Sequence, residues 1–401
     1  MKENSFRTKS VTEKMKIEFA DRVNRLPPYI FAEIEKLINE KKAQGVDLIS
    51  LSIGDPDLPP PAFVIDALKE EVANVKNHNY SFSQGEPDFR QAVADWYKKR
   101  FHVDLGQDQV VALLGSKEGI ANIARAFVNS GDQVLVSDPA YPVYANGSTI
   151  LCDGVAVLMP LLENNGFKPD FEALNPKKAK MMFLNYPNNP TAATGDKKFL
   201  KEAVDFARDN NIILCYDNAY SEVNYDGYKA PSILEVDGAM DVAIEFHSLS
   251  KTFNMTGDRI AFAVGNKQIV NGLTKIKSQI DSGPSVYIQK VAAKALATYK
   301  SAEPPEFLKK NNQILSNRRD TLVECLGDVG FPCEKPKATF YVWVNCKGDS
   351  MEFATKLLNV GVAVTPGIGF GKCGEGYARI TFTQPKERIK EACERIRSIY
   401  K

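Results

Sequence analysis

The middle of the chain alternates between short apolar runs and segments in which apolar residues recur every three or four positions. The first pattern is typical of buried strands and the second of helices that cover a sheet. This alternation predicts a largely parallel α/β sheet with helices on both faces, whose ligands bind at the carboxyl ends of the strands. We expect strands at residues 110–114, 133–136, 154–159, 180–185, 212–216, 242–246 and 260–264, and helices at residues 62–73, 120–129, 199–208, 269–278 and 286–299.

The two ends of the chain carry a different pattern, which suggests a second unit. A helix is predicted at residues 29–42, followed by a short strand; near the C-terminus, short strands surround a helix at residues 352–358. A chain of 401 residues is long enough for two domains. We predict a large domain at residues 49–290 and a smaller α+β domain made of residues 1–48 with 291–401.

Charge and composition indicate what kind of molecule the protein binds. Lysine and arginine total 51 against 50 for aspartate and glutamate, so the chain lacks the basic field that nucleic acid or an anionic membrane attracts. No apolar run approaches the roughly 20 residues of a membrane helix, and residues 1–16 lack the apolar core of a signal peptide. We expect a cytoplasmic protein with a small soluble substrate.

The spacing of the cysteines and histidines argues against disulfides and a metal site. The seven cysteines are scattered without a Cys-x-x-Cys pair, and the three histidines are not spaced as a pair. We therefore expect reduced thiols and no His-based metal site.

Lys251 is the strongest candidate for chemistry. It follows the apolar run 242–246 and precedes the run 260–264, so we expect it on a loop between strands. A lysine amine is nucleophilic only when deprotonated, which burial or a cationic neighbour such as Arg259 favours. Ser248, Ser250 and Arg259 are donors suited to a phosphate, and an amine beside them fits an aldehyde cofactor with a phosphate group, such as pyridoxal phosphate. Taken alone, a loop of this composition is more often a solvated turn.

Further candidates follow other predicted strands. Ser116 and Lys117 open a helix whose positive end favours a phosphate, although an ordinary capped helix has the same pattern. Tyr141 could be a core aromatic, and Asp217 a helix cap. Arg379 lies in a strand otherwise suited to burial, where most arginines are paired structurally.

A glycine-rich stretch at residues 366–376 invites comparison with nucleotide-binding loops. Cys373 stands where a phosphate loop has Ser or Thr, and a strand follows where a helix is required. We interpret the stretch as a mobile active-site loop.

The run from Ser248 to Arg259, Ser-Leu-Ser-Lys-Thr-Phe-Asn-Met-Thr-Gly-Asp-Arg, resembles the cofactor-lysine signature of class I and II aminotransferases of pyridoxal-phosphate fold type I. The resemblance covers nearly the whole chain from about residue 26. It implies a seven-stranded, mostly parallel sheet between helices, a smaller α+β domain, pyridoxal 5′-phosphate as cofactor, and a homodimer with shared active sites.

The resemblance also implies roles for individual residues. Lys251 would bond the cofactor covalently and move the substrate proton, Asp217 would keep the ring nitrogen protonated, and Tyr220 would bond the phenolate oxygen. The implied cofactor-binding residues are Ser116, Lys117, Tyr141 stacked on the ring, Asn189, Asp217, Tyr220, Ser248, Lys251, Arg259 and, from the partner subunit, Tyr80. The implied substrate-binding residues are Gly54, Arg379, Asn189 and Tyr29.

Within that family, residues 244–257, 159–170 and 364–371 resemble LL-diaminopimelate aminotransferases, which transfer an amino group from glutamate to tetrahydrodipicolinate in lysine biosynthesis. Three positions depart from the pattern. Asp258 replaces a common tryptophan, Ser83 replaces a glutamate that plant-type members use for the distal ammonium, and Ala192 replaces a glycine.

Other functions remain open from the sequence. The same fold serves aminotransferases for aspartate, alanine, aromatic or N-succinyl-diaminopimelate substrates, and the same cofactor serves β-elimination. A non-catalytic regulatory module that binds the cofactor is a more distant alternative, because the N-terminus leaves no room for a winged-helix domain.

Overall fold

A seven-stranded sheet forms the centre of the protein. The computed structural model describes residues 15–28 and 30–400. The strands are β2 (Val110–Leu113), β3 (Gln133–Asp138), β4 (Val155–Pro160), β5 (Ala179–Asn185), β6 (Ile213–Asp217), β7 (Ala243–Ser248) and β8 (Ala261–Gly265). They lie in the order β2-β8-β7-β6-β5-β3-β4, and β8 alone runs antiparallel to its neighbours. The predicted α/β class and mostly parallel sheet are confirmed.

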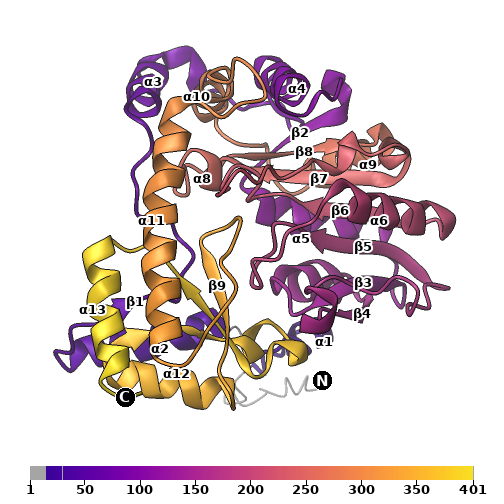
Figure 1. The fold of residues 1–401 in the computed structure, drawn as a ribbon. Helices are drawn as coiled ribbons and strands as arrows, with labels where there is room; N and C mark the ends of the chain where they lie inside the picture. The colour runs from indigo at the N-terminus through magenta and orange to yellow at the C-terminus, as the bar shows by residue number, and fades with distance from the viewer. Residues whose placement is uncertain (1–14, 29, 401) are drawn as a thin grey trace, which may run out of the picture.

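Both faces of this sheet are covered by helices (Figure 1). One face packs against α5 (Ser116–Phe127) and α9 (Lys267–Lys277). The other packs against α3 (Ala62–Ala73), α4 (Pro87–Phe101), α6 (Lys197–Asp209) and α10 (Val286–Leu296). Successive strand residues point to opposite faces, so Val110 and Val111 enter different clusters.

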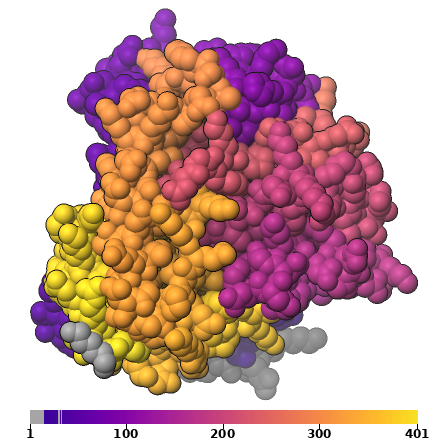
Figure 2. All heavy atoms as spheres, viewed as in Figure 1, coloured from indigo at the N-terminus to yellow at the C-terminus, as the bar shows by residue number. Residues whose placement is uncertain are grey.

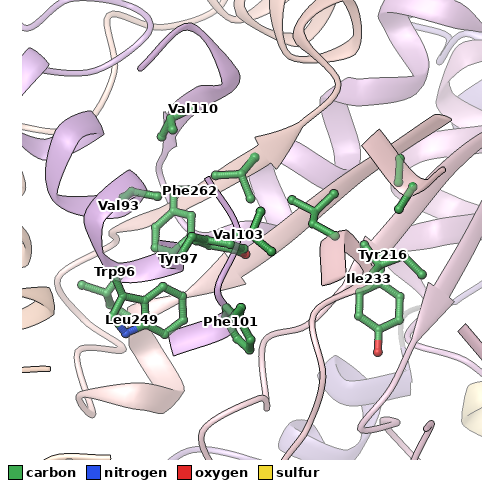
Figure 3. Packing of buried hydrophobic residues seen from close by; sticks show 14 of the residues in the cluster. Val93, Trp96, Tyr97, Phe101, Val103, Val110, Tyr216, Ile233, Leu249 and Phe262 are labelled. Carbon is green, nitrogen blue, oxygen red and sulfur yellow. The ribbon is translucent and has the colours of Figure 1, made fainter. Parts of the chain in front are cut away.

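The second face contains the aromatic part of the core (Figure 3). Trp96 of α4 has edge contacts to Tyr97, Phe101 and Phe262, with ring centroids 5.3, 5.3 and 6.0 Å away. Edge-to-face pairs of this kind stabilise by about 0.5–1.5 kcal/mol beyond the area they bury. The contacts fix α4 against β8, the strand that follows the lysine segment.

The N- and C-terminal parts of the chain build a second unit together. Its elements are α2 (Ile30–Ala43), β1 (Ile49–Ser50), α11 (Glu306–Asp328), β9 (Tyr341–Asn345), α12 (Ser350–Asn359), β10 (Val362–Ala363), β11 (Thr365–Pro366), β12 (Tyr377–Thr381) and α13 (Lys386–Arg397). β1 pairs in parallel with β10, and β12 lies antiparallel between β11 and β9. Residues 49–50 therefore group with the C-terminal strands.

The helix α11 connects the two units. It runs from beside α10 down to α13 (Figure 1), and the orange and yellow C-terminal atoms pack against the magenta middle of the chain (Figure 2). Arg318 of this helix forms two hydrogen bonds to Asp57, and Arg319 pairs with Asp226. Neither α11 nor α13 was predicted.

The cysteine prediction was wrong for one pair. Cys325 and Cys393 form a disulfide between α11 and α13, with their Cα atoms 5.9 Å apart, a separation that a disulfide requires. They are 68 positions apart in the sequence, and only the packing of two unpredicted helices brings them together. The other five cysteines are free.

Two absences hold for the described part of the chain. None of its helices has the length and apolar character to cross a membrane. It also contains no group of three or more histidine, cysteine, aspartate or glutamate residues placed to hold a metal ion.

Candidate active site

A cavity of about 460 Å³ lies between the carboxyl ends of the parallel strands and the C-terminal strands. Eleven residues predicted from the sequence meet in its wall: Gly54, Ser116, Lys117, Tyr141, Asn189, Asp217, Tyr220, Ser248, Lys251, Arg259 and Arg379. Tyr80 is 93% exposed and does not line this cavity. Tyr29 lies outside the described residues.

Lys251 lies in a one-turn helix rather than in the expected loop. The turn is α8 (Leu249–Thr252), and it begins where Ser248 Oγ accepts a hydrogen bond from the Ser250 amide. A serine cap of this kind satisfies an amide that would otherwise lack a partner. The apolar runs on both sides were recognised, but a single helical turn has too few residues to show a period.

The environment of Lys251 favours a reactive amine. Its Nζ donates to the Gly54 carbonyl at 3.1 Å. Burial lowers the pKa of this amine to about 8; the positive charges of Arg379 and Arg259 add to the shift, and Asp55 opposes it. A substantial fraction of the amine is therefore neutral, and nucleophilic, near physiological pH.

Asp217, at the end of β6, is buried and also lines the cavity. Tyr144 donates a hydrogen bond from its hydroxyl to Oδ2 at 2.8 Å, and the Ala219 amide donates to Oδ1 at 3.3 Å. Burial raises the pKa of Asp217 to about 6, against the effect of these two donors. A cation placed beside this carboxylate would favour its ionised form.

Tyr144 was missed by the sequence analysis. It follows Tyr141 by three positions and lies in a short π-helical segment (Val143–Thr149). That spacing brings both rings to the same side of the turn, where they meet edge to face at 6.0 Å. This second tyrosine, three positions after Tyr141, was the sequence signal that could have identified it as a site residue.

The N-terminus of α5 forms one end of the cavity. Gly115 precedes it with a φ of +94°, and a Cβ there would overlap the Arg259 guanidinium. Arg259 donates to the Thr256 and Leu114 carbonyls at 2.8 and 3.2 Å. The amides of a helix N-terminus, Ser116 and an arginine together form a site suited to a phosphate.

Arg379 of β12 forms the other end. Nη1 donates to Asn189 Oδ1 and Nη2 to the Ser52 carbonyl, both at 2.7 Å. Its guanidinium carbon lies 4.3 Å from the Tyr341 ring centroid and 4.7 Å from that of Phe370. These contacts hold a planar donor group in a defined orientation.

Tyr341 also contacts Tyr220, and the two hydroxyls are 2.8 Å apart. Burial raises the pKa of Tyr220 well above its usual value, so this hydroxyl stays protonated and available as a donor. Tyr341 and Phe370 were not singled out in the sequence because each stands within an ordinary apolar or glycine-rich pattern.

The glycine-rich stretch folds into two short 3-10 turns, Gly367–Phe370 and Lys372–Gly374. The Ala140 amide donates to the Phe370 carbonyl at 2.9 Å, and the Cys373 amide donates to Asp138 Oδ1 at 3.1 Å. The end of β3 thus holds this stretch, and with it the Phe370 ring, against the cavity.

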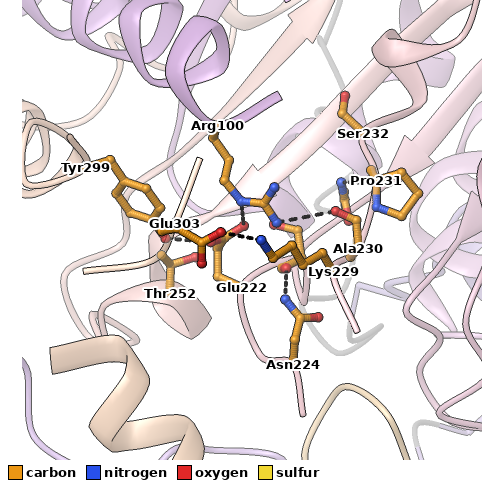
Figure 4. Close-up of polar contacts among 12 residues, drawn as sticks. Arg100, Glu222, Asn224, Lys229, Ala230, Pro231, Ser232, Thr252, Tyr299 and Glu303 are labelled. Atoms are coloured by element: carbon orange, nitrogen blue, oxygen red, sulfur yellow. Dashed lines mark hydrogen bonds and ion pairs between the residues drawn. The ribbon is translucent and has the colours of Figure 1, made fainter. Parts of the chain in front are cut away.

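Figure 4 shows a polar network around Arg100 and Glu222, both of which are buried. Arg100 Nε donates to Glu222 Oε1 at 3.0 Å, and the Tyr299 hydroxyl donates to the other carboxylate oxygen. In a second buried contact, His247 Nε2 and Thr252 Oγ1 are 3.1 Å apart. The first contacts tie α4 and the residues after α10 to the segment that carries Tyr220, and the second joins β7 to the turn that carries Lys251.

Comparison with known proteins agrees with this geometry. The family described as aminotransferase class I and II matches residues 46–396. The chain belongs to this family. LL-diaminopimelate aminotransferases of Desulforudis audaxviator and Moorella thermoacetica are 50% and 49% identical to this aminotransferase; the alignments cover 94% and 95% of this chain and 97% and 98% of theirs.

Solved structures of similar proteins share its fold. Substrate-bound BacF from Bacillus subtilis is 36% identical, with a TM-score of 0.90 over 96% of this chain and 98% of that one. Aspartate aminotransferase from Thermus thermophilus with maleate is 27% identical, with a TM-score of 0.87 over 96% of this chain and 100% of that one.

Aminotransferases of this family use pyridoxal 5′-phosphate, and the cavity fits it. The α5 amides with Ser116, Ser248 and Arg259 match the phosphate, and Lys251 matches the aldehyde. Asp217 matches the ring nitrogen. The bound cofactor supplies an aldehyde that reacts with amines and a ring that withdraws electrons from the substrate Cα.

With the cofactor in place, residues of this aminotransferase would do the remaining work. The Asp217 carboxylate would stabilise a proton on the ring nitrogen, which electron withdrawal needs. The Lys251 amine would remove a proton from the substrate Cα as a general base. Arg379 would present paired donors of the kind that bind a carboxylate.

Proposed function

We propose that this aminotransferase is an LL-diaminopimelate aminotransferase, which transfers an amino group between glutamate and tetrahydrodipicolinate in lysine biosynthesis. The observation that carries the proposal is the identity of about half of all positions to curated proteins of that name across almost the full length. The cavity supports it, since an amine, a buried carboxylate and an arginine of the kinds that transamination needs line the same cavity.

A purified-enzyme assay with LL-diaminopimelate as donor and 2-oxoglutarate as acceptor tests this function. We expect glutamate to form at a higher kcat/KM than from aspartate, alanine, an aromatic amino acid or N-succinyl-LL-diaminopimelate. Preference for one of those donors would replace the proposed substrate, and release of ammonia without consumption of 2-oxoglutarate would indicate β-elimination. We place the reaction in the cytoplasm, which cell fractionation checks.

We further propose that the enzyme is a homodimer in which Tyr80 reaches the partner's cofactor phosphate. Tyr80 is 93% exposed, Phe82 65% and Ile280 47%. Ser81 Oγ donates to the Ser282 carbonyl at 2.7 Å, so the two segments that expose these side chains lie together. Exposed apolar patches of this kind typically bind another protein surface.

Mixed dimers test the shared site. A dimer of one Tyr80→Ala chain with one Lys251→Ala chain has one intact site if the tyrosine acts across the interface, because the chain that retains Lys251 receives Tyr80 from its partner. We expect about half of the wild-type activity per dimer. If the tyrosine acted within its own chain, that site would lack it and the mixed dimer would be as defective as Tyr80→Ala.

A further inference from the structure

Glu35 is a cavity residue outside the groups that the cofactor and the α-carboxylate require. It lies on α2, where Ile34 and Ile38 are buried against Ala363. Successive helix residues are separated by about 100°, so Glu35 lies beside this buried face. It lines the cavity together with Gly54 and Asp55, yet it is exposed to solvent. Its carboxylate is therefore at the rim.

The charges of the cavity can be assigned one at a time. Those lining it are the cations Lys117, Lys251, Arg259 and Arg379 and the anions Glu35, Asp55 and Asp217. Asp217 is at the position of the ring nitrogen. Asp55 acts on the amine of Lys251, whose pKa it raises against the effect of burial. Glu35 is the remaining anion, and it forms no ion pair with another described residue that would neutralise it.

The proposed substrates differ at the end that does not react. LL-diaminopimelate carries a second ammonium group beside its distal carboxylate, whereas glutamate carries only a carboxylate. The carbon chain of diaminopimelate is also two atoms longer. A carboxylate at the rim attracts the distal end of the longer substrate through an ammonium group that the shorter one lacks.

We propose, on the basis of the function proposed above, that Glu35 binds the distal ammonium group of diaminopimelate and so determines specificity for a diamino acid. The interaction is a charge-assisted hydrogen bond from the ammonium to the carboxylate. It selects by attraction at the far end of the substrate, while Lys251 and Arg379 act on the end common to both substrates.

The test compares LL-diaminopimelate with L-2-aminopimelate, which has the same chain length and distal carboxylate but hydrogen in place of the second ammonium. The measured quantity is the ratio of the two kcat/KM values for the cofactor-loaded wild-type dimer and its variants. We expect the wild type to favour LL-diaminopimelate and Glu35→Gln to reduce this ratio by about two- to fivefold, the range for an exposed charge pair. Glu35→Asp should retain part of the preference.

Glu40→Gln is the matched control, because Glu40 is an exposed glutamate on the same helix, 4.0 Å from Lys36, and does not line the cavity. It should keep the wild-type ratio. A second readout is salt: the wild-type preference should fall as NaCl is raised, since exposed charges are screened, and Glu35→Gln should lose this dependence.

The outcomes separate the two proposals. If the wild type transaminates LL-diaminopimelate but Glu35→Gln keeps its full preference, or the preference is insensitive to salt, the assignment of Glu35 is overturned while the proposed function stands. If the wild type fails to use LL-diaminopimelate at all, the proposed function itself is overturned.

Discussion

The Tyr144 hydroxyl donates a 2.8 Å hydrogen bond to Oδ2 of Asp217, and both side chains are buried. Burial alone would favour the protonated acid, and this donor opposes it. In the role proposed for it, Asp217 would support electron withdrawal by the cofactor ring only when it is ionised. We therefore propose that Tyr144 helps Asp217 to stay ionised at mildly acidic pH.

Replacing Tyr144 with phenylalanine should raise the pKa of Asp217 above its value of about 6. A hydrogen bond to a charged group contributes about 1.5–3 kcal/mol, equivalent to roughly one to two pKa units. A cationic ring nitrogen would itself favour the ionised form of Asp217, so the effect is measured on the binding of pyridoxal phosphate to the cofactor-free protein. We expect the acid limb of this binding profile to move up by about one unit, with a smaller effect at pH 8.

Tyr97→Phe is the matched control for Tyr144→Phe. Tyr97 is equally buried and donates at 2.8 Å to another buried carboxylate, that of Glu245. Its loss should leave the acid limb in place. An acid limb that moved equally in both variants would mean that Tyr144 has no specific action on Asp217.

The lowered pKa of Lys251 predicts a pH-dependent stability. Its pKa is about 8 in the folded, cofactor-free protein against 10.5 for an ordinary lysine. The unfolded chain thus binds the proton of Lys251 more tightly than the folded protein does. This difference lowers the free energy of unfolding; the effect is fully present below pH 8 and disappears above pH 10.5. Lys251→Met should raise the free energy of unfolding by about 1–3 kcal/mol at pH 7, by less at pH 9.5.

Lys117→Met provides the comparison for Lys251→Met, because Lys117 lines the same cavity but is exposed. It measures what the loss of a lysine that is not buried does to unfolding at the two pH values. Denaturant titrations at pH 7 and 9.5 decide the point, and an equal offset for Lys251→Met at both values would contradict the predicted titration. Borohydride with pyridoxal phosphate should label the wild type and leave Lys251→Met unlabelled.

Arg379→Lys tests the proposed carboxylate clamp. Lysine keeps the charge but has no planar pair of donors to match the hydrogen bonds to Asn189 and Ser52. We expect kcat/KM to fall about 100-fold or more for every amino acid and oxo acid, mostly through KM. Arg397→Lys is the control, because Arg397 forms an exposed ion pair with Asp328, and its kcat/KM values should be close to those of the wild type. A small effect of Arg379→Lys that differed between substrates would contradict the proposed carboxylate clamp.

Gly371→Ala should destabilise the protein and weaken substrate binding together. Its φ is +135°, and a Cβ would overlap Asp138 Oδ1, so we expect a loss of about 1–3 kcal/mol. Moving this residue also moves Phe370 away from Arg379, which should raise KM.

Gly327→Ala is the control, and we expect it to stabilise the protein. Gly327 lies in α11 with open space around it, and alanine there should stabilise the fold by up to about 1 kcal/mol. Thermal unfolding and KM measurements compare the two, and an unchanged KM in Gly371→Ala would separate the loop from substrate binding.

Most of the sheet and the main members of the cavity could be predicted from the sequence because their signals are local. Asp217 and Ser116 could be singled out because they stand at or just after the ends of predicted strands. The run around Lys251 is long enough to identify a family. Tyr341 and Phe370 could not be found in this way, since their importance comes from contact with Arg379, and a contact across the fold leaves no mark on either segment.

The helix α11 was missed for a related reason. Its buried residues include Arg318 and Arg319, which interrupt the apolar pattern of its inner face. The partners of these arginines, Asp57 and Asp226, are far away in the sequence. The disulfide prediction failed with it, because Cys325 and Cys393 meet only where this helix contacts α13.

Arg379 donates to the carbonyl of a residue 327 positions earlier in the chain, next to the strand that pairs with β10. During synthesis on the ribosome, Lys251 and Asp217 emerge well before this arginine. The groups that we assign to the cofactor are thus synthesised before the arginine that we assign to the substrate carboxylate. Every newly made chain must pack its last strands against the segment at residues 49–52 before that arginine reaches the position seen here.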